Sequence, residues 1–283
     1  MTSAVLNRLQ LKVSRRLDGL LQGDYLGLLP GPGSEAGESR AYVPGDDVRR
    51  MDWPVTARTT VPHVRLTVAD RELETWLAVD LSPSLAFGTA KMLKRDLALI
   101  AVSAMTQLTI RGGNRVGAVI GSSCVPARGG RGASLRILKT AAGYDGPFPE
   151  LAVLVDALNR PPRRRGLAVV ISDFLDQDWE RPLRKLSARH DVLAIELTDP
   201  RELDLPDVGV LELVDPETGS VHCVQTTPSL RERYAVAARA QRAAIAERIR
   251  GSGARHLRLG TDGDWLASMV KFVAAQRHRR RQR

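Results

Sequence analysis

The stretch Thr75-Trp-Leu-Ala-Val-Asp80-Leu-Ser-Pro-Ser84 decides the fold. It begins as a short apolar run and ends in an acid followed by turn residues. A helical spacing of apolar residues follows from about Thr89 to Arg111, and the glycines at 112 and 113 end it. An apolar strand, a polar turn and a long helix in succession are typical of a sheet whose strands alternate with helices.

The same alternation continues toward the C-terminus. We expect strands at 116–120, 167–171, 192–197, 210–214, 221–225 and near 256–259. The expected helices lie at about 133–142, 150–160, 178–189, 228–250 and up to about 276. Several of these strands are apolar throughout, which is the pattern of strands covered on both faces. The sequence therefore predicts an α/β fold: a mostly parallel sheet with helices on both faces.

The first 74 residues have a different character. Residues 1–17 have the pattern of an amphipathic helix, 18–40 are a Gly-rich loop, and 42–68 suggest short strands and turns. We expect an N-terminal helix and β-rich extension at 1–74, and the α/β domain at 75–283. The domain would end in a basic, disordered tail, Arg277 to Arg283.

The chain is strongly basic, with a net charge of +10 and a pI near 10.3. Of its 42 basic residues, 36 are Arg and 6 are Lys, which is the bias expected of a GC-rich genome. We favour this bias and a basic tail over a dedicated nucleic-acid surface. Binding of nucleic acid through phosphates, without sequence readout, is the alternative function.

Cysteine content and hydropathy indicate the cellular compartment in which we expect the protein. Cys124 and Cys223 are too few and too far apart for a disulfide framework or a zinc site, so we expect two small buried side chains in a reducing cytosol. No uncharged apolar run reaches the ~18 residues that span a bilayer. We expect a soluble, cytoplasmic protein without a transmembrane segment.

Candidate ligands for a metal ion follow two of the expected strands. Asp80, Ser82 and Ser84 come directly after the first strand of the sheet, and Asp173 ends the strand at 167–171. In a sheet of order 3-2-1-4-5-6 the first and fourth strands are neighbours, and ligands bind at their carboxyl ends. Two carboxylates and two hydroxyls suit a hard cation such as Mg²⁺. The competing interpretation is that Asp80 and the serines cap the long helix and the turn before it.

Catalytic motifs are missing from the sequence. There is no Gly-x-Ser-x-Gly around the serines, and no phosphate-binding Gly-x-x-x-x-Gly-Lys-Ser/Thr. A metal-dependent hydrolase that uses Asp80 and Asp173 is the most distant alternative. We expect a protein that is not an enzyme.

Two parts of the sequence carry a resemblance. Asp-x-Ser-x-Ser with a later Ser-Asp resembles the metal-ion-dependent adhesion site of von Willebrand factor A domains. Arg40-Ala-Tyr-Val-Pro-Gly-Asp-Asp-Val-Arg-Arg-Met-Asp-Trp53, followed by Thr56-Ala-Arg58, resembles the signature of a bacterial family of unknown biochemical function. Its members contain a von Willebrand factor A-like domain and are commonly encoded beside MoxR-type AAA+ ATPases. With weaker matches further on, the resemblance covers about residues 35–235.

The resemblance implies a function in protein–protein interaction. The chain would be a partner or adaptor of a MoxR-type AAA+ ATPase, and of other proteins of the same operon. Mg²⁺ held by Asp80, Ser82, Ser84 and Asp173 would be completed by an acidic residue of the partner. One departure is that the Thr of the family's metal site corresponds here to Pro149, which has no hydroxyl. Either a water near Glu150 replaces it, or the site binds metal weakly or not at all.

The signature segment has two interpretations. Its polar and aromatic side chains form a docking surface for a partner, or they satisfy one another inside the segment. In the second case, which we favour, Asp46 and Asp47 accept hydrogen bonds from turn amides while Arg40 or Arg49 balances their charge. The candidate docking residues are Arg40, Tyr42, Asp46, Asp47, Arg49, Asp52, Trp53 and Arg58.

Overall fold

The structure is a computed structural model of the whole chain. It describes residues 3–20, 39–44, 46–48, 51–65, 74–160, 166–214 and 219–281. Within these ranges, no helix is both long enough and apolar enough to cross a membrane.

A six-stranded sheet forms the centre of the molecule, with the spatial order β10-β7-β6-β3-β4-β5. All neighbouring strands are parallel except β4 and β5. Numbered within this sheet alone, the order is 3-2-1-4-5-6, as the sequence analysis assumed. The predicted α/β class, a mostly parallel sheet with helices on both faces, is confirmed. The strands are β3 (Glu74–Val79), β4 (Arg115–Ile120), β5 (Ser123–Arg128), β6 (Leu167–Ser172), β7 (Asp191–Thr198) and β10 (Arg255–Gly260).

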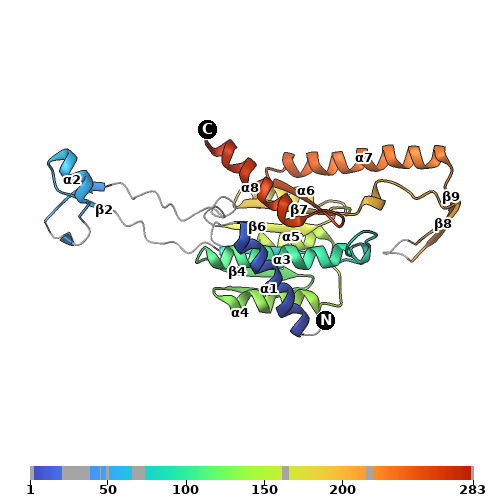
Figure 1. Ribbon diagram of the computed structural model, residues 1–283, viewed down its shortest axis with the longest axis horizontal. Helices are drawn as coiled ribbons and strands as arrows, with labels where there is room; N and C mark the ends of the chain where they lie inside the picture. The colour runs from blue at the N-terminus through green and yellow to red at the C-terminus, as the bar shows by residue number, and fades with distance from the viewer. Residues whose placement is uncertain are drawn as a thin grey trace.

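Helices cover both faces of this sheet (Figure 1). One face carries α1 (Ser3–Leu20), α3 (Lys94–Arg111), α4 (Arg131–Ala142) and α8 (Trp265–Arg281), and the other carries α5 (Leu151–Leu158), α6 (Glu180–Ser187) and α7 (Pro228–Gly251). Successive strand residues point to opposite faces. In β3, Leu77 and Val79 enter the core under α3, and Trp76 and Ala78 enter the core under α5.

Helix α1 belongs to the core of the α/β domain. Its residues Leu6, Val13 and Leu17 are at most 3% exposed and pack with residues of α3 and α4. The amphipathic helix predicted at 1–17 is therefore confirmed. We predicted that this helix belongs to the extension at 1–74, whereas in the structure it packs on the α/β domain.

Two smaller β units lie outside the main sheet. In the signature segment, β1 (Ser39–Ala41) pairs antiparallel with β2 (His63–Arg65), and α2 (Trp53–Thr59) lies between them in the sequence. The second unit is an antiparallel hairpin of β8 (Val210–Val214) and β9 (Val221–Gln225), at the bounds predicted from the sequence. The hairpin lies between the carboxyl end of β7 and the start of α7.

Three details differ from the predictions. Helix α3 begins at Lys94, about five residues later than expected, because the backbone amide and hydroxyl of Thr89 bind the Asp199 carboxylate (2.8 and 2.6 Å). Helix α8 runs to Arg281, through most of the tail that we expected to be disordered. Cys124 and Cys223 are both exposed, because each lies in a strand with an uncovered side.

Candidate functional site

The register of two neighbouring strands brings the predicted carboxylates together. Val79 of β3 pairs with Ile171 of β6, and the Asp80 amide donates to the Ile171 carbonyl (3.0 Å). Asp80 and Asp173 therefore leave adjacent strands at the same edge of the sheet. Both are buried, at 4% and 2% exposed. The adjacency that the sequence analysis assumed is confirmed.

A chain of hydrogen bonds links the two carboxylates through the predicted serines. The Ser82 amide donates to Asp80 Oδ1 (2.8 Å), and the Ser82 and Ser84 hydroxyls lie 3.1 Å apart. The Ser84 hydroxyl donates to Asp173 Oδ2 (2.9 Å). Ser172, the last residue of β6, donates to Asp80 Oδ2 (2.7 Å). All four predicted ligands thus converge, and the two serines remain partly open to solvent.

The competing interpretation, that Asp80 and the serines cap the long helix and the turn before it, is wrong for the helix and holds only for the turn, where Asp80 Oδ1 accepts from the Ser82 amide. The residue before α3 is Leu93, eleven residues after Ser82, and the acid in the first turn of α3 is Asp96. Ser82 precedes only a single 3-10 turn, η3 (Pro83–Ala86), and its side chain makes no capping hydrogen bond there. The polar side chains are therefore directed at one another and not at a helix terminus.

A buried lysine occupies the inner side of the site. Lys94, the first residue of α3, is 1% exposed. Its ammonium lies 2.7 Å from Asp173 Oδ2 and 2.6 Å from Glu202 Oε1. A cation at a helix N-terminus is unfavourable for the helix dipole, and burial of an ammonium is costly unless it is paired. Lys94 is held at this position by the two carboxylates.

Behind Lys94, a second buried cation connects the site to α7. Arg242 donates to the Asp173 carbonyl (2.8 Å), to Glu202 Oε2 (2.6 Å) and to Glu196 Oε1 (3.3 Å). Glu196 is fully buried and also accepts from Arg258 (2.8 Å). Burial alone would raise the pKa of Glu196, but the hydrogen bonds it accepts outweigh burial and hold that pKa below its ordinary value.

Asp80 is the carboxylate of this site without a cationic partner among the described residues. Burial, together with repulsion from Asp173, raises the pKa of Asp80 from 3.8 to about 6. The hydrogen bonds from Ser172 and Ser82 offset only part of this effect. A further cation beside Asp80 would relieve both the repulsion and the desolvation.

The residues present fit a hard cation. Carboxylate and hydroxyl oxygens are the ligands that Mg²⁺ prefers, and the ion keeps several waters. The described ranges contain no group of three or more His, Cys, Asp or Glu residues arranged for a metal, so the hydroxyls of Ser82 and Ser84 are needed to complete the set. Because Lys94 already neutralises Asp173, we expect weak metal binding by the chain alone.

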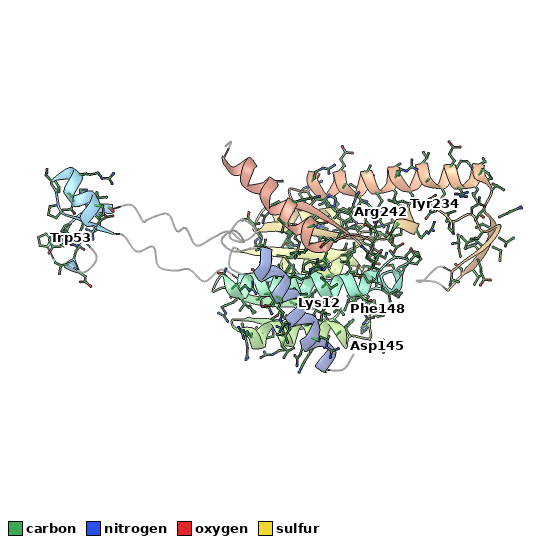
Figure 2. All side chains as sticks on the ribbon, in the orientation of Figure 1. Lys12, Trp53, Asp145, Phe148, Tyr234 and Arg242 are labelled. Atoms are coloured by element: carbon green, nitrogen blue, oxygen red, sulfur yellow. The ribbon has the colours of Figure 1, made fainter. Side chains whose placement is uncertain are left out.

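The loops around the site expose apolar side chains. Phe87 follows η3, Leu175 follows Asp173, and Phe148 precedes α5; their exposed fractions are 41%, 39% and 38%. The Leu151 amide donates to Asp176 Oδ2 (2.7 Å), which fastens the start of α5, next to Pro149, to the loop after β6. Figure 2 shows Phe148, Tyr234 and Arg242 toward one end of the sheet.

Several polar groups of the signature segment form hydrogen bonds with one another. Arg40 binds Asp46 through two hydrogen bonds (2.7 and 2.6 Å), and Asp46 also accepts from the Val43 amide (2.9 Å). These bonds hold the pKa of Asp46 below its ordinary value. Asp52 is buried, accepts from the Ser39 hydroxyl and caps α2. The internal network is thus confirmed for Arg40 and Asp46.

Other side chains of the segment differ in their exposure. Trp53 is 67% exposed, and Asp47 and Arg58 are exposed too, while Tyr42 is half-buried. Arg49 lies outside the described residues. These exposed side chains keep the docking hypothesis open for this part of the segment.

Sequence reasoning missed Lys94, Glu202, Arg242 and Glu196. One signal pointed to Lys94, because a chain with 36 Arg and 6 Lys has a lysine at the start of a long and largely buried helix. Glu196 interrupts an otherwise apolar strand, which is a second such signal. Glu202 and Arg242 lie in segments rich in charge and had no distinguishing pattern.

Comparisons with known proteins agree on a family without an established activity. Residues 38–244 match the family model described as "Protein of unknown function DUF58". The uncharacterized protein Rv1480 of Mycobacterium tuberculosis is 57% identical over 284 residues, which cover 97% of this chain and 90% of that protein. The uncharacterized protein MAV169 of Mycobacterium avium is 48% identical over 158 residues, or 54% of this chain and 94% of that protein.

Solved structures show a more distant likeness. The conserved hypothetical protein BatB of Bacteroides thetaiotaomicron superposes with a TM-score of 0.47 at 13% identity, over 73% of this chain and 99% of that one. An aerotolerance-related membrane protein of Bacteroides fragilis gives a TM-score of 0.46 at 16% identity, over 72% and 98%.

Proposed function

The chain belongs to the DUF58 family of proteins of unknown function, and from this premise we propose that it is a non-catalytic adaptor that binds a protein partner at the carboxyl edge of its sheet. We further propose that Mg²⁺ held by Asp80, Ser82, Ser84 and Asp173 bridges the two proteins.

The charge of the buried site carries this proposal. Asp80, Asp173, Glu196 and Glu202 supply four negative charges, and Lys94, Arg242 and Arg258 supply three positive charges. The site therefore lacks one positive charge, and Mg²⁺ would leave it with one in excess. Buried charge is costly unless it is paired. One carboxylate from a partner would restore neutrality, so the site favours an acidic ligand from outside over a closed set of its own.

The surroundings of the site favour a protein over a small anion. Phe87, Phe148 and Leu175 present apolar surface beside the polar centre. Exposed apolar side chains next to polar groups are found at protein-binding surfaces. The resemblance of the signature segment supports a MoxR-type AAA+ ATPase as the partner, with other proteins of the same operon next.

The test is affinity capture with the full chain from a native lysate in Mg²⁺, with the bound proteins identified by mass spectrometry. Asp80→Asn keeps the shape of the site and removes its charge. Asp156→Asn, on the exposed surface of α5, is the matched control. Because EDTA also strips the nucleotide-bound Mg²⁺ of an ATPase, the comparison of variants in Mg²⁺ is the decisive one.

We expect the wild type and Asp156→Asn to recover a AAA+ ATPase, and Asp80→Asn to recover at least tenfold less. Equal recovery by Asp80→Asn would refute the metal bridge. Recovery of nucleic acid without any ATPase would instead support the basic nucleic-acid binder.

A further inference from the structure

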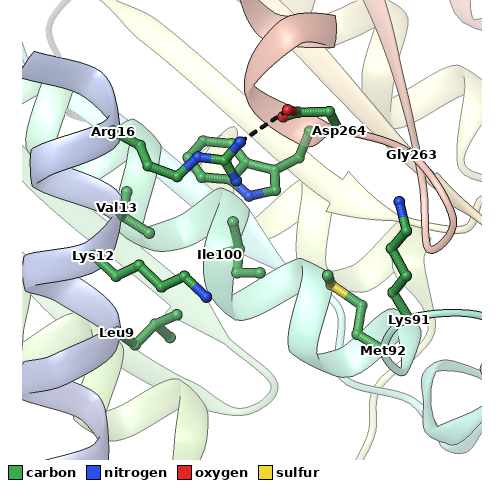
Figure 3. A pocket seen from close by; sticks show the side chains of 10 residues that line it. Leu9, Lys12, Val13, Arg16, Lys91, Met92, Ile100, Gly263 and Asp264 are labelled. Carbon is green, nitrogen blue, oxygen red and sulfur yellow. Dashed lines mark hydrogen bonds and ion pairs between the residues drawn. The ribbon is translucent and has the colours of Figure 1, made fainter. Parts of the chain in front are cut away.

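A second candidate site lies between the N-terminal helix and the start of α8. It is a pocket of about 280 Å³, formed by α1, the start of α3 and the turn after β10 (Figure 3). Its apolar lining comes from Leu9 and Val13 of α1, Ile100 of α3 and the adjacent Met92. The candidate metal site of Asp80, Ser82, Ser84 and Asp173 does not require this pocket.

Three cations border the apolar lining, and among the described residues only Arg16 has an acidic partner. Arg16 binds Asp264 (2.8 Å) and stacks on the ring of Trp265, with 5.4 Å from the guanidinium carbon to the ring centroid. Lys12 reaches in from α1, and Lys91 lies on the opposite side (Figure 3). Neither lysine forms an ion pair with any described acid, and both are exposed. Within the part of the chain that the structure describes, the rim therefore carries two positive charges without an acidic partner.

We propose that this pocket binds a peptide segment in which one apolar side chain is flanked by acidic residues. The apolar side chain would enter between Val13, Ile100 and Met92. Its acidic neighbours would meet Lys12 and Lys91. An aromatic anchor fits especially well, because the Met92 thioether forms favourable contacts with a ring.

The dimensions of the site favour a peptide over a membrane. The volume is at the lower end of ligand pockets, which start at about 300 Å³, so it accommodates one side chain better than a cofactor or an acyl chain. Recognition of an anionic membrane by charge usually needs about four to eight basic residues in a cluster. Arg8 and Arg15 of α1 are exposed too but do not line the pocket. At the pocket itself, Lys12 and Lys91 beside an apolar lining match the charge pattern of a short acidic peptide.

Gly263 offers a way to close the pocket without changing its charge. A Cβ built at this position has its nearest contact at 3.5 Å, with the Gly260 carbonyl oxygen, which is ordinary van der Waals separation. Gly263→Leu should therefore fold normally and place its side chain in the pocket. Lys12→Gln with Lys91→Gln removes the charges and leaves the pocket open. Arg239→Glu, an exposed cation on α7 across the sheet, is the control for net charge.

The probe is an acetylated pentapeptide with a central phenylalanine between two pairs of glutamates, observed by saturation-transfer NMR with the full chain in EDTA. EDTA separates this test from the Mg²⁺ bridge, so either proposal can fail alone. We expect saturable binding in the range of ~0.1–1 mM. The double lysine variant and Gly263→Leu should each weaken it at least tenfold, and Arg239→Glu should stay within threefold.

Several outcomes would overturn the proposal. These are no saturable binding by the wild type, equal binding by Gly263→Leu, or equal binding of a peptide with glutamine in place of each glutamate. Vesicles of phosphatidylcholine and phosphatidylserine provide the last comparison. If the chain binds them through Lys12 and Lys91 and does not bind the peptide, the surface recognises lipid and the proposal is wrong.

Discussion

At the scale of single residues, Lys94 and Asp80 are two buried charged groups of the same site that differ in their partners. Lys94 is a buried cation between two carboxylates, at 2.7 and 2.6 Å, and Asp80 is a buried carboxylate whose neighbours are hydroxyls and a backbone amide. Burial of either group costs free energy, but only the lysine has charged partners to offset that cost. The site therefore has a resident cation on one side and an unbalanced acid on the other.

Replacing Lys94 should destabilise the chain strongly. Lys94→Met leaves Asp173 and Glu202 short of a counter-charge, and breaking a buried ion pair costs about 3–5 kcal/mol. We expect a loss of about 3 kcal/mol in the free energy of unfolding, measured by urea denaturation in EDTA. Mg²⁺ should recover part of this loss, because a divalent ion beside Asp173 replaces the missing charge.

The control for this prediction is a surface pair of the same type. Arg184 and Glu180 on α6 have side chains 62% and 33% exposed, so Arg184→Met should change stability by less than about 0.5 kcal/mol. If Lys94→Met costs no more than Arg184→Met, the buried lysine is not held by its carboxylates. A full loss without any recovery in Mg²⁺ would argue against metal binding at the site.

The pKa of Asp80 predicts a dependence of stability on pH. Its pKa rises from 3.8 to about 6 on folding, so the folded chain binds this proton more tightly than the unfolded chain does. The resulting stabilisation is complete below about pH 4 and is lost as the pH rises through about 6, by up to about 3 kcal/mol. In Asp80→Asn, the side chain at position 80 stays uncharged at every pH. In EDTA, the stability of this variant relative to wild type should therefore rise over this interval.

Urea denaturation at a series of pH values measures that difference. Asp156→Asn provides the comparison for removal of an exposed acid over the same range. A difference between Asp80→Asn and wild type that stays constant from pH 4 to 7 would contradict the prediction. Mg²⁺ needs the ionised carboxylate, so metal binding by the wild type should weaken below about pH 6.

At the scale of secondary-structure elements, the site depends on how closely β3 and β6 approach. Gly166 directly precedes β6, and a Cβ built there lies 2.1 Å from the Glu74 carbonyl oxygen of β3. Gly166→Ala should push these strands apart at one end and cost about 1–3 kcal/mol in the free energy of unfolding. The same strands hold Asp80 and Asp173 at their other end.

A glycine-to-alanine substitution in α4 should have the opposite effect on stability. A Cβ on Gly132 meets nothing within 4 Å, so Gly132→Ala should stabilise the chain by about 0.4–1 kcal/mol through the lower entropy of the unfolded state. Thermal unfolding of both variants by circular dichroism is the measurement. Equal midpoints for the two variants would show that the β3–β6 contact tolerates a side chain.

These elements also show how far sequence alone reaches. The apolar strands that end in Asp80 and Asp173 were predictable, because full burial on two faces leaves an unbroken apolar run. Strand β5 was missed, because it is an edge strand that contains Pro126 and buries only alternate side chains. Its pattern is shorter and more polar than that of a central strand.

The charged part of the site was less predictable than its metal ligands. The serines follow Asp80 directly in the sequence, so a short pattern revealed them. Lys94 meets Glu202 only through the fold, over 108 positions, and Arg242 meets Glu196 over 46. No local periodicity encodes such pairs, and a sequence-based prediction has to place all the strands before it can find them.

At the scale of the whole molecule, the question is whether the N-terminal helix and the domain that carries the site unfold as one unit. Leu17 of α1 is 1% exposed and packs in the core shared with α3 and α4, whereas Leu11 on the same helix is 59% exposed. Leu17→Ala should therefore lower the free energy of unfolding by about 2–5 kcal/mol. Leu11→Ala should change it by less than about 0.5 kcal/mol.

Urea denaturation followed by both circular dichroism and tryptophan fluorescence tests this expectation, because Trp265 stacks against Arg16 of α1 and reports on the helix. If α1 is part of the cooperative unit, both signals shift together in Leu17→Ala and share one midpoint. A fluorescence change that precedes the loss of circular dichroism would show that α1 detaches first. In that case the pocket with Lys12 and Lys91 would open before the site of Asp80 and Asp173 is lost. The two candidate sites would then belong to units of different stability.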